Sequence, residues 1–362
     1  MPHEGFSWRT IGANASDWLA KFSSRPQDAG ADSAVRKSWF SNVRREGSPW
    51  HGLSTVFMKE LSDNLASARM VVLELLMVLF GAVVVYFAAE QLRQGTAEDP
   101  FLFLRLFAPP GESLLTFVTV LSILVPLMAI GLGFDAINGE HSRRTLSRIL
   151  AQPIYRDALL LGKFLAALAT LSISLVILWL MVIGFGLLRL GIPPSGEELG
   201  RSLVFLLMTV CYAGVWLAVA MLFSIVFRAT ATAALISLGL WLFVAMIWPA
   251  LSKPLADMFS PPDLRYAMLG LPTPDNLLLQ ISLARFSPST LYSEAITVIL
   301  NPGVNSLSPL FLEQTQGMVR GAPLPLGQSI IIAWPQTVAL IAATILLYVV
   351  GYVIFQRQEV RA

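Results

Sequence analysis

The chain has 362 residues, of which 55% are hydrophobic and 13% are charged, and its formal net charge is +2. Soluble domains carry roughly 25% charged residues, so this composition excludes an ordinary soluble domain and indicates an integral membrane protein. The single cysteine, Cys211, excludes a disulfide framework, and the scattered histidines form no metal-binding pattern, so we expect no metal site.

Residues 1–52 are expected to be a polar cytoplasmic segment, and they contain no apolar core of a cleavable signal peptide. Two stretches within them place aromatic and aliphatic side chains on one helical face and charged, mostly basic side chains on the other. This pattern is typical of helices that lie in the membrane interface. A partly disordered tail fits the same residues, so both alternatives stay open.

Residues 53–69 predict an amphipathic connecting helix that leads into the first membrane span. Apolar side chains recur there at helical spacing, at Leu53, Val56, Phe57, Leu61 and Leu65. Lys59 and Glu60 lie outside that stripe, so the helix is expected to run along the membrane surface.

Six apolar segments follow, and each is long enough to cross roughly 30 Å of hydrocarbon at about 1.5 Å per residue. We place these spans near residues 70–89, 114–134, 159–187, 203–227, 231–251 and 330–355. The few residues around Arg228 predict a tight hairpin between the fourth and fifth spans. The expected fold class is therefore an all-α integral membrane protein with six transmembrane helices.

The basic residues near the spans predict the orientation, because cytoplasmic loops carry an excess of Lys and Arg. With the N-terminus inside, the cytoplasmic set is Lys59, Arg69, Arg143, Arg144, Arg148, Arg156, Lys163, Arg228, Arg357 and Arg361. The short outer loops hold only Arg93, Arg105, Arg189 and Arg201. We therefore expect a multi-pass protein of the cell inner membrane with both termini, including the tail 356–362, in the cytoplasm.

Residues 252–329 then form an outer segment between the fifth and sixth spans. Apolar spacing from Pro274 to Phe286 predicts one short helix, and Ser287-Pro288 predicts the cap and first position of a second. We expect the two helices to pack on the outer mouth of the bundle; a loose loop is the alternative.

The stretch from Asp135 to Lys163 is dense in charge and lies between two apolar runs. Leu146, Ile149 and Leu150 fall on one face of a short helix, with Arg144 and Arg148 away from it. Pro153 ends that helix, since proline cannot donate the next backbone hydrogen bond. Asp157 is placed to cap the following apolar helix.

The sequence shows no residue pattern that is typical of a catalytic site. Gly162-Lys163 does not belong to a phosphate-binding loop, because Asp157 stands where the upstream glycine is required and Phe164 replaces the hydroxyl residue. We therefore expect no catalytic residues and no cofactor site in this chain. Glu74, a carboxylate in the first span, is expected to reach the interface or pair with Arg69 rather than to carry transport chemistry.

The charged stretch resembles the loop after the second span of ABC-2 type permeases, the membrane subunits of ATP-binding-cassette exporters. The matching residues are Asp135-Ala136-Ile137-Asn138-Gly139-Glu140, Thr145-Leu146, Ile149-Leu150-Ala151-Gln152-Pro153, Arg156 and Gly162-Lys163. His141 and Arg143 stand where the family more often has a basic residue and a glycine. Phe286-Ser287-Pro288 and Glu294-Ala295 resemble the outer helices of members related to the permease of nitrous oxide reductase maturation. The resemblance covers roughly residues 53–361.

The resemblance implies that residues 136–156 form a coupling helix that docks on a separate ATPase subunit, which binds the ATP and Mg²⁺. The residues expected to make this coupling are Glu140, Arg143, Arg144, Leu146, Leu150, Pro153 and Arg156. A second permease chain, identical or paralogous, and membrane lipids are the other expected partners, and no nucleic acid is expected. The function implied is export of a substrate that the sequence does not identify.

Three alternatives remain from the residues alone. The charged helix could lie on the lipid surface without a protein partner. The chain could be a membrane-embedded enzyme or anchor acting on lipids, which requires polar residues clustered at one interface. It could also be an ion-coupled transporter, which requires carboxylates at mid-membrane in related halves, and the sequence shows no such repeat.

Overall fold

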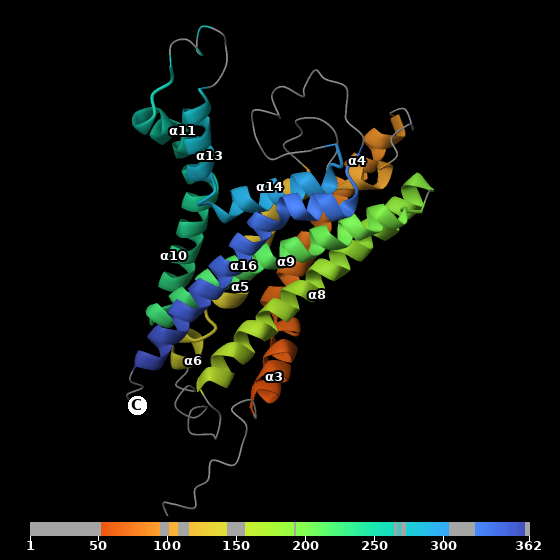
Figure 1. Ribbon diagram of the computed structural model, residues 1–362. Coiled ribbons are helices and arrows are strands. Elements are labelled where there is room, and N and C mark those ends of the chain that lie inside the picture. The colour runs from red at the N-terminus through yellow and green to blue at the C-terminus, as the bar shows by residue number, and fades with distance from the viewer. Residues whose placement is uncertain are drawn as a thin grey trace, which may run out of the picture. The chain divides into compact units, whose positions relative to one another are not determined.

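The computed structural model describes residues 52–94, 101–107, 116–142, 156–191, 193–263, 266, 268, 273–303 and 323–358. The chain divides into two units, residues 1–48 and 49–362, and every described residue lies in the second. The described residues form helices and connecting turns with no strand among them (Figure 1). The predicted interfacial helices of residues 1–51 lie outside the described residues.

Six helices in the described part of the chain are long and apolar enough to cross a membrane, which confirms the predicted number of spans. They are α4 (Ala68–Gln94), α5 (Phe117–Gly133), α8 (Arg156–Leu190), α9 (Gly196–Val226), α10 (Thr230–Leu242) with its continuation, and α16 (Leu326–Arg357). α10 continues through the π-helix η3 (Phe243–Ile247) into α11 (Trp248–Phe259). The 35 residues of α8 extend about 52 Å, longer than the hydrocarbon core is thick, so α8 is tilted or extends beyond the membrane.

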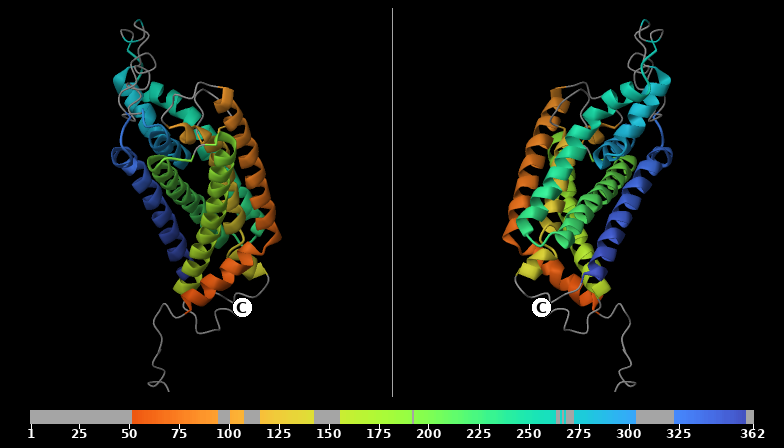
Figure 2. Two further views of the ribbon diagram at one scale, coloured as in Figure 1. Left: turned by 90° about the vertical axis from the view of Figure 1, so that its right-hand side faces the viewer. Right: turned by 90° about the vertical axis from the view of Figure 1, so that its left-hand side faces the viewer.

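α3 (Leu53–Leu65) is shorter than the predicted connecting helix of residues 53–69. The helix is interrupted at Ser67, whose Oγ accepts a hydrogen bond from the backbone N–H of Met70 at 3.2 Å. This bond caps the start of α4, and serine is a preferred residue at such a position. α3 therefore ends before the first span and crosses the base of the bundle (Figure 2).

The outer segment contains the two predicted helices, α13 (Pro274–Ala284) and α14 (Pro288–Leu300). α13 packs on α11, whereas α14 packs on α9 and α16. Tyr292, Ala295, Val298 and Ile299 of α14 are fully buried, whereas Ser293 and Thr297 are exposed, so one face of α14 packs against the bundle. Ser287 precedes α14 as predicted, but its side chain accepts no capping hydrogen bond.

α9 is the central helix of the bundle, since two thirds of its apolar window is buried, against 11% for the fifth span and 17% for the sixth. It approaches α5 closely because position 133 is glycine: a Cβ there would lie 2.8 Å from the Cβ of Ala220. The exposed surfaces of the outer helices are rich in Val, Leu, Ile and Phe, which suits contact with lipid.

The bundle has two ends, named here the α3 end and the α14 end. The α3 end holds α3, the short helix α6 (Asn138–Ser142) and the last turn of α16. The α14 end holds α14 and the 3₁₀ helix η2 (Leu102–Leu106) (Figure 1).

Candidate functional site

An ion cluster around Lys163 joins three elements at the α3 end. The Lys163 Nζ lies 3.0 Å from Glu60 Oε1 of α3 and 2.6 Å from Glu140 Oε1 of α6. Only 5% of the Lys163 side chain is exposed, and each glutamate is 16% exposed. A buried ammonium group requires such partners, because desolvation of an unpaired charge is costly. The cluster therefore fixes α3, α6 and α8 to one another.

Glycine next to the lysine permits this contact. A Cβ at Gly162 would lie 2.8 Å from Val56 Cγ1, so only glycine lets α3 approach α8 so closely. Glu60 lies four residues after Val56, on the same face of α3. The close approach therefore delivers the Glu60 carboxylate to Lys163.

Lys59 extends the cluster along the exposed side of α3. Its Nζ lies 2.9 Å from Asp63 Oδ2 and 3.2 Å from Glu60 Oε1. Partial burial disfavours the charged form of Lys59, but the hydrogen bonds and negative charges of Asp63 and Glu60 outweigh that effect and raise its pKa above the ordinary 10.5. The stability that comes from the raised pKa of Lys59 is fully present below about pH 10.5 and is lost as the pH rises through the raised pKa, so Lys59 contributes no pH dependence near neutrality.

The segment that enters the predicted coupling helix is anchored to α4 and α9. Asp135 Oδ2 pairs with Arg69 of α4 at 2.8 Å. Ser224 Oγ of α9 accepts the backbone N–H groups of Ile137 and Asn138 at 3.0 and 3.2 Å. The Asn138 side-chain amide also donates to the backbone carbonyl of Phe227, just after α9, at 3.2 Å. This entry flank is thus attached to α4 and α9, and to α8 through the contact of Glu140 with Lys163.

The exit flank is attached to the end of α16. Arg156 donates to the backbone carbonyl of Gln358 at 3.2 Å. The Asp157 carboxylate accepts from the Tyr352 hydroxyl at 3.1 Å and from the Gln356 side-chain amide. Asp157 was predicted to cap α8, but α8 starts at Arg156 and Asp157 lies in its first turn. Its carboxylate is therefore used for a contact between helices.

The predicted coupling residues fall into two groups. Glu140 and Arg156 are described and lie at the two flanks, and Lys59 and Glu60 lie on α3 as predicted. Arg143, Arg144, Leu146, Leu150 and Pro153 lie outside the described residues. Lys163 was noted as a cytoplasmic basic residue and as part of a Gly-Lys pair. Its role as the centre of the cluster was missed, because its partners are distant in sequence.

Of the two alternatives for Glu74, reaching the interface or pairing with Arg69, the pairing is wrong. Arg69 pairs with Asp135 and also lies over the ring of Phe134, 5.4 Å from its centroid. Both carboxylate oxygens of Glu74 are buried, and neither has a hydrogen-bond partner among the described residues. Arg69 prefers Asp135 because that carboxylate lies at the helix end, where both groups remain partly in contact with water.

Arg201, predicted as a loop residue at the opposite side, is fully buried at the α14 end. Its guanidinium donates to Glu197, to the backbone carbonyls of Ile299 and Leu324, and to Ser329 Oγ. These bonds join the start of α9 to the end of α14 and the start of α16. Arginine suits this position because its planar group carries five donors. No local pattern distinguishes it from an exposed loop arginine.

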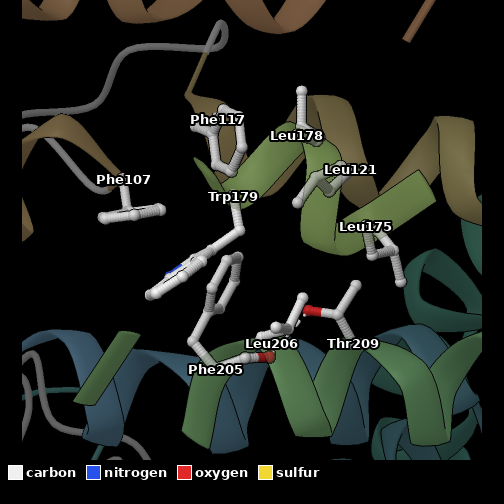
Figure 3. A pocket seen from close by; sticks show the side chains of 9 residues that line it. All are labelled: Phe107, Phe117, Leu121, Leu175, Leu178, Trp179, Phe205, Leu206 and Thr209. Carbon is white, nitrogen blue, oxygen red and sulfur yellow. Dashed lines mark hydrogen bonds between the residues drawn. The ribbon is translucent and has the colours of Figure 1, made fainter. Parts of the chain in front are cut away.

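A small pocket lies among η2, α5, α8 and α9 (Figure 3). It is lined by Phe107, Phe117, Leu121, Leu175, Leu178, Trp179, Phe205, Leu206 and Thr209. The cavity volume is about 10 Å³, close to the least space that one water molecule needs, so the pocket does not accommodate a drug-sized cargo in this conformation. No group of His, Cys, Asp and Glu suitable for a metal ion occurs within the described ranges.

Comparison with known proteins adds two findings. A family model described as ABC-2 family transporter protein matches residues 54–360. A probable ABC transporter permease protein NosY of Pseudomonas aeruginosa is 31% identical over 201 residues, which cover 54% of this chain and 67% of the relative. The protein of the same name from Stutzerimonas stutzeri is 29% identical over 235 residues, which cover 62% of this chain and 79% of the relative.

Proposed function

The chain belongs to the ABC-2 family of transporter proteins and is a membrane subunit of an ABC transporter, and we propose that it couples ATP hydrolysis by a separate ATPase to export of a substrate. The family membership confirms the resemblance of the charged stretch. The chain itself is proposed to have no ATPase site, with ATP and Mg²⁺ bound by the partner. A second permease chain would complete the transporter.

The observation that carries the proposal is the anchoring of both flanks of residues 143–155. On the entry side, Glu140 contacts Lys163, and on the exit side Arg156 contacts Gln358. A segment held at both ends by charged and polar contacts transmits a displacement to the helices that hold it. This arrangement supports a role for the segment as the docking point of a motor.

The proposed orientation places the α3 end in the cytoplasm, where ATP is available to an ATPase. The α3 end carries exposed cations on α3, α4 and the α9–α10 turn, at Lys59, Arg69 and Arg228. An excess of such residues is typical of cytoplasmic faces. In this orientation the protein lies in the cell inner membrane with both termini inside, and α14 lies on the outer side.

The two alternative functions receive less support from the described residues. Two carboxylates of the outer segment, a group that a lipid-modifying enzyme would need, are engaged in structural contacts: Glu294 with Arg285 at 2.9 Å, and Asp257 with Asn276 at 2.8 Å. An ion-coupled transporter needs several polar groups around an intramembrane carboxylate, whereas Glu74 has no partner among the described residues.

Co-purification tests the proposal. The full chain is expressed with candidate ATPases encoded beside its gene, and we expect one to co-purify with the wild type. Leu146→Asp with Leu150→Asp introduces charge on the predicted docking face and should abolish that association. Met258→Asp with Leu278→Asp, on exposed positions of the outer segment, is the matched control and should leave the association intact. Equal binding by wild type and the 146/150 variant refutes the docking assignment, and the absence of any binding ATPase refutes the exporter.

A further inference from the structure

The end of α16 lies at the exit flank and carries four polar contacts to other helices. Tyr352 and Gln356 donate to Asp157, and the backbone carbonyl of Gln358 accepts from Arg156. The side-chain amide of Gln358 donates to the backbone carbonyl of Ile225 in α9 at 2.8 Å. Residues 352–358 are called the α16 clasp below.

The clasp and the entry flank meet at one place. Ser224 Oγ and the backbone carbonyl of Phe227 accept hydrogen bonds from residues 137–138. The backbone carbonyl of Ile225, which lies between them in sequence, accepts a hydrogen bond from the side chain of Gln358. The backbone carbonyl of Gln358 in turn accepts a hydrogen bond from Arg156. The last turn of α9 and Phe227 are therefore a common anchor for the two flanks of residues 143–155, and the contacts form a closed ring.

Without the clasp, α16 would have little connection to α8. α16 packs chiefly on α9 and α14 and only slightly on α8. Apart from the polar contacts, Phe164 of α8 meets Tyr348 of α16 with ring centroids 5.2 Å apart. The bonds to Asp157 are charge-assisted and lie in the first turn of α8, where a carboxylate is also stabilised by the helix dipole.

From this geometry we propose that the α16 clasp is a positioning device that makes the sixth span move together with the coupling segment. Tyr352, Gln356 and Gln358 are its positioning residues. The inference rests on the proposed function, since it assigns a path to the displacement that the ATPase produces. A displacement of residues 143–155 then reaches α16 through Asp157 and Arg156, in addition to α5 and α8, which are joined to the segment by the chain itself.

Spin-label distances in the complete transporter test the clasp. In a Cys211→Ser background, labels are placed at Met58→Cys on α3 and Val353→Cys on α16, both at exposed positions. The chain is reconstituted with its ATPase in lipid nanodiscs, and the distance between the labels is measured without nucleotide and with ATP plus vanadate. With an intact clasp, α16 moves together with α8, to which α3 is joined by the Lys163 cluster. The distance between the two labels should therefore stay within its original distribution in both states.

Gln356→Ala with Gln358→Ala removes two of the clasp donors, and the distance is then expected to shift with ATP plus vanadate by more than the width of the distribution. Gln356→Lys keeps a partner for Asp157 and, paired with wild-type Gln358, should behave like the wild type. Arg357→Ala is the matched control, because Arg357 is exposed and lies between the two glutamines. If the double variant does not purify, Tyr352→Phe removes one donor and should give a smaller shift.

An unchanged distance in the clasp variant, or an equal shift in Arg357→Ala, overturns the clasp. If Tyr352→Phe is used in place of the double variant, an unchanged distance in Tyr352→Phe also overturns the clasp. Failure of the proposed function is distinguishable, because then no ATPase co-purifies even with the wild-type chain. A shift confined to the clasp variants supports the proposal.

Discussion

Lys163 and Glu74 are ionisable side chains with buried polar atoms, and they differ in whether they contact a group of opposite charge among the described residues. Lys163 lies between two carboxylates at 2.6 and 3.0 Å, so its charge is compensated. Glu74 has both oxygens buried and without a partner among the described residues. Removing a partner from a buried ion pair is costly, whereas removing an uncompensated polar group can be neutral or favourable. The two residues should therefore respond oppositely to replacement.

Lys163→Leu is expected to destabilise the protein by about 3–5 kcal/mol, because the buried ammonium that joins Glu60 to Glu140 is lost. The measurement is the thermal unfolding midpoint of the purified chain in detergent. Lys59→Leu serves as a control, since Lys59 is 62% exposed, and should change the midpoint little. A Lys163→Leu protein as stable as the Lys59→Leu protein would show that the cluster does not hold α3 in place.

Glu74→Leu is expected to leave the unfolding midpoint unchanged or to raise it, because leucine removes two buried oxygens that make no hydrogen bond within the described part of the chain. The same detergent assay measures it. A loss of stability as large as that of Lys163→Leu would mean that Glu74 has a partner in the folded protein.

At the residue scale, sequence alone identified which side chains carry charge but not which of them meet. Glu140 and Arg156 were selected from the family resemblance, and both lie at the flanks of the coupling segment. The Lys163–Glu60 and Arg201–Ile299 contacts join residues far apart along the chain, and no local spacing encodes them. Partner choice depends on helix packing, which is why Glu74 was kept as a possible partner of Arg69 although Arg69 pairs with Asp135.

At the scale of elements, the contact between α3 and α8 decides whether the cluster forms. The contact is close because Gly162 has no side chain and Val56 fills the space beside it. Hydrophobic periodicity predicted α3 and the six spans, since both signals are local. It did not predict that α3 ends at Leu65, or that one face of α14 is fully buried, because these depend on the cap at Ser67 and on packing against α9 and α16.

Gly162→Ala should lower the unfolding midpoint, because its Cβ would lie 2.8 Å from Val56 Cγ1 and 3.1 Å from Val56 Cβ. Overpacking of this kind costs about 1–3 kcal/mol. Gly184→Ala in the same helix is the matched control: nothing lies within 4 Å of its Cβ, and alanine favours a helix by about 0.5–1 kcal/mol. If the two variants have the same stability, α3 does not pack against α8 as closely as described.

At the scale of the whole described bundle, polar contacts gather at its two ends, while the helices between them expose apolar surfaces. The α3 end gathers the Lys163 cluster, the anchored flanks and the α16 clasp, and the α14 end is held by Arg201. Composition and span count were predictable because they follow from the thickness of the bilayer. The ring of contacts around residues 143–155 was not, since it depends on five helices at once.

The central claim is that an ATPase binds at the α3 end, beside residues 143–155. Site-directed crosslinking measures this most directly, with single cysteines in a Cys211→Ser background at Ser142, exposed at the entry flank, and at Ser293, exposed on α14. In membranes that contain the complete transporter, Ser142→Cys should crosslink to the ATPase, and Ser293→Cys should not. Crosslinking from Ser293→Cys, or from neither position, would contradict the account.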